Sequence, residues 1–134
     1  MGSTLASLER AAHLIGAYLD PTVSKLGITQ GEAHVLARLA THGPTAIGEL
    51  HREFGHKRST LTNVVDRLER RRLVRREVNV DDRRSFVIHL TAAGRRAAAP
   101  ITRALDDLER ALDAHTDRRA LDETIDALER IVRR

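Results

Sequence analysis

The sequence of 134 residues contains no cysteine and no tryptophan. The absence of cysteine excludes disulfides, thiol redox chemistry and thiolate metal sites. Aromatic side chains are almost as rare, because Tyr18, Phe54 and Phe86 are the only ones. The core must therefore consist of leucine, valine, isoleucine and alanine, which favours packed helices over a sandwich of β-sheets.

Long hydrophobic runs are missing as well. No stretch approaches the roughly 18 apolar residues that a membrane span needs, and the first residues do not form a hydrophobic signal segment. We therefore expect a cytoplasmic protein with no membrane partner. The sequence also lacks an HExxH motif, a glycine-rich phosphate loop and a nucleophile with a base at motif spacing. We predict neither enzymatic activity nor a cofactor.

Positive charge is concentrated in one segment. Residues 57–84 contain ten lysines and arginines against five acids, a net charge of +5, whereas the whole chain carries +4. An ordinary soluble surface intersperses its charges. A focused positive patch on an otherwise neutral body indicates a polyanionic partner such as nucleic acid.

Apolar residues at spacings of three and four predict three helices before the basic segment. Pro21 should kink or end the first helix. Thr29 is a suitable N-cap for the second helix, which a turn at Gly43 follows. Thr45 is the predicted N-cap of a short third helix, and Gly55 should end it.

A fourth helix, a β-hairpin and two further helices follow. The apolar stripe of the fourth helix fits the helical period without a miss: Leu61, Val64, Val65 and Leu68. Residues 73–78 and 85–91 alternate like strands and are rich in β-branched side chains. Thr91 should cap the next helix, and Thr116 or Asp117 should start the last one.

This order of elements predicts a winged helix-turn-helix. Two short helices joined by a tight turn and followed by a two-stranded hairpin have that topology. We expect a mainly α (α+β) fold in a single domain over residues 1–134. Its DNA-binding core would span residues 27–97, with the wing at 73–91. Residues 1–26 and 98–134 would form dimerisation helices.

The fourth helix turns an unusual polar face away from its apolar stripe. At 100° per residue, this face holds Ser59, Thr62, Asn63, Asp66 and Arg67, with Arg58 and Thr60 on its flanks. Such short hydrogen-bonding side chains and arginines read base edges in a major groove. The alternative is an ordinary solvated face, but those favour Glu, Lys and Gln because these residues form helices well.

The tip of the hairpin carries the sequence Asp-Asp-Arg-Arg. An arginine at this position is attracted by the negative potential of a minor groove, which suits Arg83. Asp82 can pair with an arginine and orient its guanidinium, and Asp81 is a plausible turn residue. A solvated charged tip is the alternative.

The segments LTNVVDRLE, LVRRE, DDRR and LTAAG, in this order and spacing, resemble the MarR family of winged-helix transcription regulators. The resemblance covers about residues 27–97. It implies a homodimeric repressor that binds a pseudo-palindromic operator in double-stranded DNA, with a small-molecule effector that releases it. It also implies the DNA contacts Lys57, Arg58, Ser59, Thr60, Thr62, Asn63, Arg67, Asp82, Arg83 and Arg84. A winged-helix module for protein–protein contacts and a non-specific architectural DNA-binding protein are the alternatives.

Two positions depart from the family pattern. Arg72 occupies the turn where the family usually has glycine, and a positive φ there would strain it by about 1 kcal/mol. We expect a remodelled turn, with Arg72 adding a phosphate contact. In the family, the fourth helix is the recognition helix and usually has a Ser or Thr cap. Here Lys57 stands at that position, and a cation at a helix N-terminus is unfavourable unless a phosphate binds there.

The outer helices carry apolar seams that one small domain cannot easily bury. The predicted dimerisation residues are Leu5, Leu8, Ile15, Leu105, Leu108, Leu112, Leu121, Ile125, Leu128 and Val132. A two-fold symmetric homodimer would cover them and would supply two half-sites. The alternative is that these seams pack within one chain.

The sequence supports no particular ligand. His13 and Tyr18 of the first helix could line a pocket with His34 and Arg38 of the second, but rim and core positions are the favoured interpretation. The seven histidines show no i, i+4 pair beside a carboxylate base, so we predict no metal site.

Overall fold

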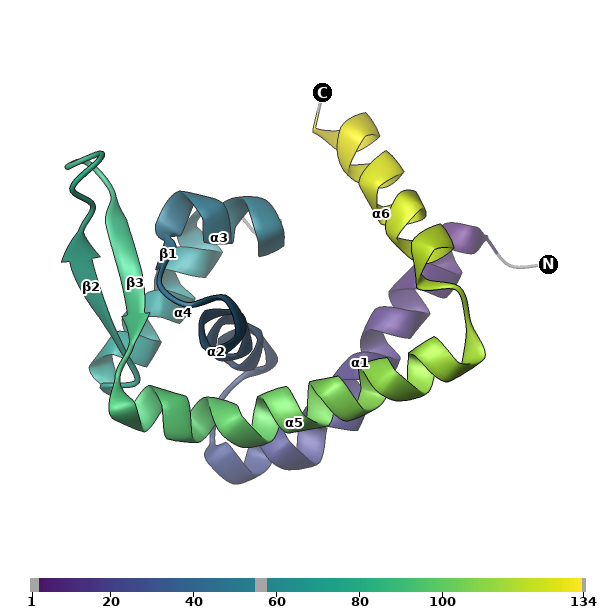
Figure 1. The fold of residues 1–134 in the computed structure, drawn as a ribbon, viewed down its shortest axis with the longest axis horizontal. Helices are drawn as coiled ribbons and strands as arrows, with labels where there is room; N and C mark the ends of the chain where they lie inside the picture. The colour runs from purple at the N-terminus through teal and green to yellow at the C-terminus, as the bar shows by residue number, and fades with distance from the viewer. Residues whose placement is uncertain (1–2, 55–57, 134) are drawn as a thin grey trace. The chain divides into compact units, whose positions relative to one another are not determined.

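The computed structural model describes residues 3–54 and 58–133, and the chain divides into two compact units, residues 1–104 and 105–134. Its elements are α1 (Thr4–Leu26), α2 (Gln30–His42), β1 (Thr45–Ala46), α3 (Ile47–Phe54), α4 (Arg58–Arg70), β2 (Val74–Val78), β3 (Phe86–Leu90), α5 (Ala92–His115) and α6 (Arg118–Val132). Figure 1 shows them in chain order. The predicted mainly α fold with a winged helix-turn-helix is confirmed. Among the described helices, none has the length and apolar composition for crossing a membrane.

Helix α1 continues through Pro21, so the prediction that proline would end it was wrong, and the kink stays a prediction. Proline removes one backbone donor from the helix. Leu19 and Val23 lie on either side of it and are both buried, so packing holds the helix together across the missing bond. The helix ends at Gly27, whose φ of 67° is left-handed. Glycine adopts that conformation without steric cost.

The turn after α2 begins a short strand that the sequence did not predict. Thr29 caps α2 as expected, because its hydroxyl accepts a hydrogen bond from the Glu32 N–H at 3.2 Å. Thr45, however, does not cap α3. It belongs to β1, lies opposite Ile88 of β3, and its hydroxyl donates to the Gly43 carbonyl at 2.9 Å. The backbone pairs with β3 instead of starting the helix.

The sheet has the order β1-β3-β2, with both pairs antiparallel. Ile88 at its centre is fully buried. Thr91 caps α5 as predicted, since its hydroxyl accepts from the Gly94 N–H at 3.0 Å. That glycine brings α5 against the end of the hairpin, because a Cβ there would lie 1.9 Å from the Leu73 carbonyl oxygen.

The core of the first unit is aliphatic, as the scarcity of aromatic residues predicts. Its largest fully buried side chains are Leu19, Leu36, Leu50, Leu61, Leu68, Ile88, Ile101, Val35, Val65 and Val74. All four predicted apolar positions of α4 are buried. On α3, Leu50 is buried as expected, but Ile47 and Phe54 are only half-buried.

The second unit consists of the end of α5 and helix α6. Asp117 caps α6 and accepts from the Arg119 N–H at 3.0 Å. Arg118 bridges two carboxylates of α5, Glu109 at 2.6 Å and Asp113 at 3.3 Å. Glu109 first and Asp113 second raise the pKa of this guanidinium. No described residue of α6 is buried.

Candidate nucleic-acid interface

Helix α4 has its apolar side in the core and a polar side outside it. Ser59, Thr60 and Asn63 are exposed, and Thr62 is half-buried. Arg58 begins the helix, but its side chain lies outside the described part of the chain, as does Lys57 altogether. The exposed polar face predicted from the sequence therefore exists over the described residues of this helix.

Arg67, on the same face, already has a partner for its guanidinium. Its Nε donates to Glu32 Oε1 of α2 at 2.9 Å, and the carboxylate side chain is only 5% exposed. An unpaired buried carboxylate is costly, so this pair anchors the recognition helix to α2. The DNA contact predicted for Arg67 stays a prediction.

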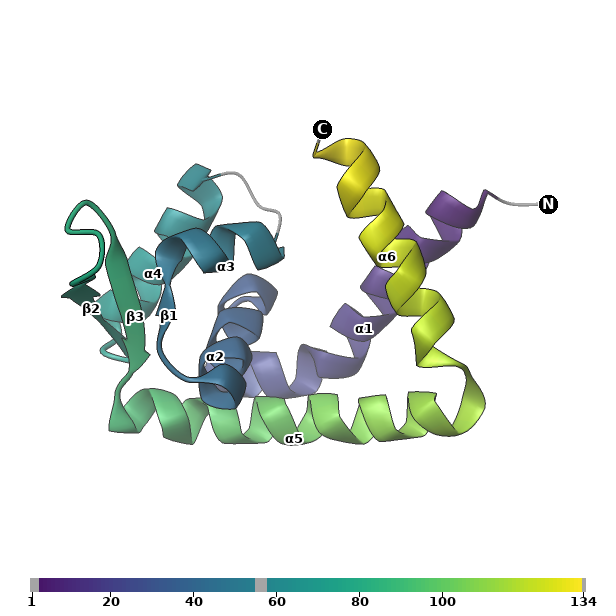
Figure 2. The same ribbon diagram turned by 45° about the horizontal axis from the view of Figure 1, so that its top comes forward.

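The wing is attached to α4 through Arg76 of β2. Its Nη2 donates to the carboxylate of Asp66, and its Nε lies 3.9 Å from Glu69. The same guanidinium stands over the ring of Phe86, 6.0 Å from its centroid. The sequence placed Asp66 on the outward face of α4 but did not identify this contact. In both views the hairpin lies beside α4 (Figure 1 and Figure 2).

The wing tip is a folded turn organised by Asn79 and Asp82. The Asn79 side-chain oxygen accepts from the Asp81 N–H at 3.1 Å, and the Asn79 backbone carbonyl accepts from the Asp82 N–H at 3.2 Å. Asp82 in turn accepts from the Arg84 N–H at 3.1 Å and pairs with the Arg84 guanidinium at 3.3 Å. The predicted aspartate–arginine pair is confirmed. Asn79 was missed, although asparagine at a turn is a recognisable signal.

A groove joins α3, α4 and the wing. Its volume is about 470 Å³, and Thr62, Asp82 and Arg84 line it together with His51 of α3. Three of the predicted DNA contacts therefore lie around one depression. Arg83 is exposed beside it, and within the described residues it forms no ion pair. Its charge is available to an external anion.

Arg72 adopts a φ of 60°, so the expectation of a remodelled turn was wrong. The turn keeps the left-handed conformation for which glycine is suited, and arginine adopts it at a steric cost. Hydrogen bonds on both sides hold it there. The Arg72 N–H donates to the Glu69 backbone carbonyl at 2.9 Å, and the Arg72 carbonyl accepts from the Thr91 hydroxyl at 2.7 Å.

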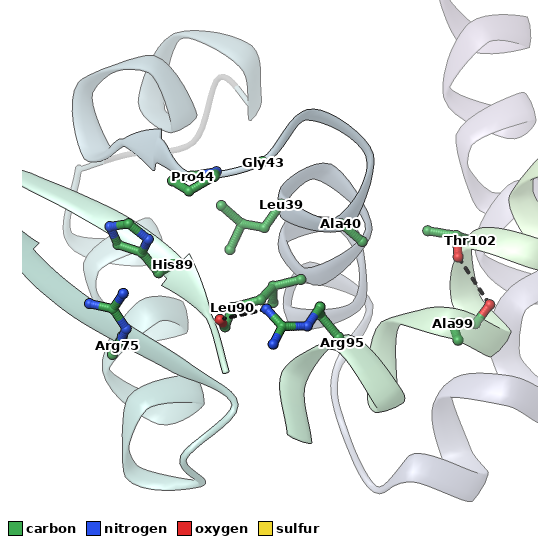
Figure 3. Close-up of a pocket in the computed structure, with 10 residues that line it drawn as sticks. All are labelled: Leu39, Ala40, Gly43, Pro44, Arg75, His89, Leu90, Arg95, Ala99 and Thr102. Carbon is green, nitrogen blue, oxygen red and sulfur yellow. Dashed lines mark hydrogen bonds between the residues drawn. The ribbon is translucent and has the colours of Figure 1, made fainter. Parts of the chain in front are cut away.

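A second cavity, of about 490 Å³, lies at the base of the wing. Figure 3 shows Arg75 and His89 on the two strands and Arg95 on α5 around it, with Leu39 and Pro44 on the side of α2. Arg75 and His89 share the carboxylate of Glu77, at 3.2 and 2.8 Å. Arg95 donates to the Leu90 carbonyl at 3.5 Å.

The pocket suggested by the sequence is formed only in part. His13 and His34 line a cavity of about 510 Å³ between α1 and α2. Tyr18 and Arg38 are not among its lining residues; Arg38 donates to Glu53 of α3 at 2.6 Å and to the Thr45 hydroxyl at 3.3 Å. Over residues 3–54 and 58–133, no three acidic or histidine side chains form a group suited to a metal ion.

This arrangement defines a winged helix-turn-helix protein. Comparison with known proteins indicates which family of such proteins the chain resembles. The MarR family profile matches residues 28–86. The HTH-type transcriptional repressor MdtR of Bacillus subtilis (strain 168) is 32% identical over 94 residues, which are 70% of this chain and 61% of MdtR. The chain therefore spans less than two thirds of the length of that relative. Over these residues the chain is similar to members of the MarR family.

Solved structures show the same fold. Staphylococcus aureus MepR in its DNA-binding conformation superposes with a TM-score of 0.83 at 20% identity, covering 98% of this chain and 97% of MepR. NadR superposes with a TM-score of 0.79 at 24% identity, covering 98% of this chain and 93% of NadR. The likeness extends beyond the residues that the family profile matches and includes the outer helices.

Proposed function

We propose that the chain is a sequence-specific DNA-binding transcriptional regulator that represses as a homodimer. The observation that carries this proposal is the exposed polar face of α4 beside an ordered wing whose Arg83 has no internal partner among the described residues. Ser59, Thr60 and Asn63 would meet base edges in a major groove. Arg83 would enter the adjacent minor groove.

The distribution of ion pairs separates two groups of arginines within the basic segment. Arg67 and Arg76 are bound to carboxylates of the same fold. Arg83 and Arg72 make no such pair in the described part of the chain. Arg83 at the wing tip and Arg72 after α4 would therefore contact a polyanion. The sequence adds Lys57 and Arg58 as further candidates.

The exposed apolar residues support a homodimer. Leu5 is 58% exposed, Ile125 44% and Val132 76%. An isolated soluble chain rarely exposes many large apolar side chains. A two-fold axis through the outer helices would cover them and would present two α4 helices to successive major grooves.

The relatives agree with this function. MdtR is a transcriptional repressor by name, and one MepR structure contains DNA. Both favour a regulator over a module for protein–protein contacts or an architectural protein. They also favour a regulatory role over a catalytic one.

The test is a selection of binding sites from a random duplex library. A two-fold symmetric motif with a steep dependence of affinity on salt is the expected result. Enrichment of no motif would indicate an architectural protein and would remove the base-reading roles of α4. Absence of binding to any duplex would overturn the proposal in favour of the protein–protein module.

A small-molecule effector is a second part of the proposal, and the cavity at the wing base supports it. Its lining combines Arg95 with Leu39 and Pro44, which suits a carboxylate with an apolar body (Figure 3). Arg75 and His89 line it as well, but they share the carboxylate of Glu77. NadR was crystallised with 4-hydroxyphenylacetate, which has this chemistry. A ligand here would contact both strands of the wing and α5.

The effector is tested by adding 4-hydroxyphenylacetate to the complex with the selected duplex. We expect weaker DNA binding, and we expect Arg95→Ala to raise the required concentration about tenfold. Arg96→Ala, an exposed neighbour that does not line the cavity, is the matched control. Equal responses from wild type and Arg95→Ala would exclude this cavity.

A further inference from the structure

Arg71 connects the end of the recognition helix to the end of α1. It follows the last residue of α4 and continues its hydrogen bonding, because its N–H donates to the Arg67 carbonyl at 3.1 Å. Its side chain runs to a different helix. Nη1 donates to the Gly27 carbonyl at 2.9 Å, and Nη2 donates to the Leu26 carbonyl at 3.1 Å.

The two acceptors are carbonyls at the C-terminus of α1, where a helix has unsatisfied acceptors and the negative end of its dipole. A guanidinium with two parallel donors fits two successive carbonyls, and its charge strengthens both hydrogen bonds. The left-handed φ of Gly27 turns the chain at this point. Arg71 therefore acts as a cationic cap that belongs to another helix.

Arg67 reinforces the connection one helical turn earlier on α4. It holds Glu32 in the first turn of α2, so Arg67 on α4 and Arg71 just after it both bind the corner between α1 and α2. Gly27, Glu32, Arg67 and Arg71 line one small cavity of about 320 Å³. Arg70 lines it as well, but its Nε donates within its own helix, to the Asp66 carbonyl at 3.4 Å.

We propose that Arg71 is a positioning residue that fixes the recognition helix to α1 and so sets the operator half-site spacing. This inference rests on the proposed function, in which α1 takes part in the dimer interface. If α1 is fixed by its partner copy, a rigid link from α1 to α4 fixes the separation of the two recognition helices. That separation determines which half-site spacing is bound.

The inference is distinct from a phosphate contact, the ordinary expectation for an arginine at this end of α4. A phosphate contact needs only a positive charge, which lysine also supplies. The link to α1 needs two donors in a fixed plane, which lysine does not supply. Arg71→Lys therefore separates the two roles, and Arg71→Ala removes both.

The experiment measures binding to a set of duplexes that carry the selected half-sites at different separations. We expect wild type to prefer one separation. We expect Arg71→Ala and Arg71→Lys to lower that preference about tenfold, the effect of losing a charge-assisted pair of hydrogen bonds. Arg70→Ala should keep the wild-type preference. Thermal unfolding of each variant establishes that it is folded.

Three results would overturn the inference. An Arg71→Lys variant with the wild-type spacing preference would show that charge alone matters and would exclude positioning. A uniform loss of affinity at all separations in Arg71→Ala, with a salt slope smaller by about one, would assign Arg71 to a phosphate. An unchanged spacing preference in both variants would exclude the link. A wild type that binds no duplex would instead refute the proposed function itself.

Discussion

Arg67 and Glu32 form an ion pair of 2.9 Å between the recognition helix and α2, and the exposure of the two side chains is unequal. The arginine is 43% exposed and the carboxylate 5%. The carboxylate therefore depends on the arginine more than the arginine depends on it, because water can solvate the guanidinium but not the buried acid.

Removing the arginine should consequently cost more than removing the charge of the acid. We expect Arg67→Ala to lower the free energy of unfolding by about 1–3 kcal/mol, since it leaves a buried carboxylate unpaired. Glu32→Gln should cost less. Arg70→Ala, the control on the same helix, should stay within about 0.5 kcal/mol of wild type. Urea unfolding measures all three, and equal effects of Arg67→Ala and Arg70→Ala would refute the anchoring role.

Gly94 should tolerate no side chain. An added Cβ would lie 1.9 Å from the Leu73 carbonyl oxygen, which is backbone and cannot rotate away. We expect Gly94→Ala to destabilise the protein by about 2 kcal/mol or more, because α5 must move away from the hairpin. Gly48→Ala is the matched control, because no atom of the described residues lies within 4 Å of its added Cβ. It should be neutral or stabilising. Comparable unfolding midpoints for the two variants would contradict this account.

The Arg38–Glu53 pair predicts a dependence of stability on pH. A hydrogen bond from Arg38 lowers the pKa of Glu53 from its ordinary value of 4.5, against the opposing effect of burial. A carboxyl group with a lowered pKa stabilises the fold above the unfolded-state pKa and loses this effect as pH falls through the folded-state pKa.

Wild type should therefore exceed Glu53→Gln in stability at neutral pH, and the difference should shrink in acid. Because the Glu53 side chain is 41% exposed, solvent screening should keep the difference within about 1 kcal/mol. Urea midpoints from neutral pH down to about pH 3 measure it. A difference that is constant over this range would show that ionisation of Glu53 does not contribute.

Arg83 at the wing tip is exposed and forms no ion pair among the described residues. We expect Arg83→Ala to weaken binding of the selected duplex by about 1–3 kcal/mol, and more on sites with a narrow A·T-rich minor groove. Arg10→Ala, an exposed arginine on α1, is the control for a general loss of charge. Fluorescence anisotropy gives both affinities. Unchanged binding of A·T-rich sites by Arg83→Ala would remove the minor-groove contact from the account.

Helix α6 leaves apolar residues uncovered within one chain. Ile125 is 44% exposed, and no described residue of this helix is buried. We expect Ile125→Asp to dissociate the dimer, because a desolvated carboxylate would replace an apolar contact. Thr124→Asp adds the same charge at the adjacent exposed position and should leave the dimer intact. If sedimentation showed a dimer for Ile125→Asp, α6 would not form the interface.

Local patterns predicted the fold well where packing follows the helical period. The apolar stripe of α4, the two long strands and the caps at Thr29, Thr91 and Asp117 are all present. Each of these features depends on residues within a few positions of one another. The periodicity of the sequence is sufficient to specify them.

The failures share a different cause. Pro21 remains helical because its neighbours are buried, Thr45 joins a strand because β3 is nearby, and the carbonyl of the left-handed Arg72 accepts a hydrogen bond from Thr91. These outcomes depend on partners far along the chain. No periodicity in the sequence identifies such partners.

The candidate site shows the same division. The polar face of α4 and the Asp82–Arg84 pair follow from local sequence. The partners of Arg67, Arg71 and Arg76 do not, since Glu32 and Gly27 lie far away in the sequence and Asp66 belongs to another element. Charge counting alone treats all these arginines as equivalent. The structure separates those with internal partners from those that an external anion can reach.

The central claim is that two copies of this chain read one two-fold symmetric duplex. Sedimentation equilibrium of the protein with the selected duplex, at concentrations above the dissociation constant, measures this directly. The account predicts a complex of two chains per duplex that dissociates as salt is raised. A complex of one chain per duplex, or the same mass on duplexes without the motif, would contradict it.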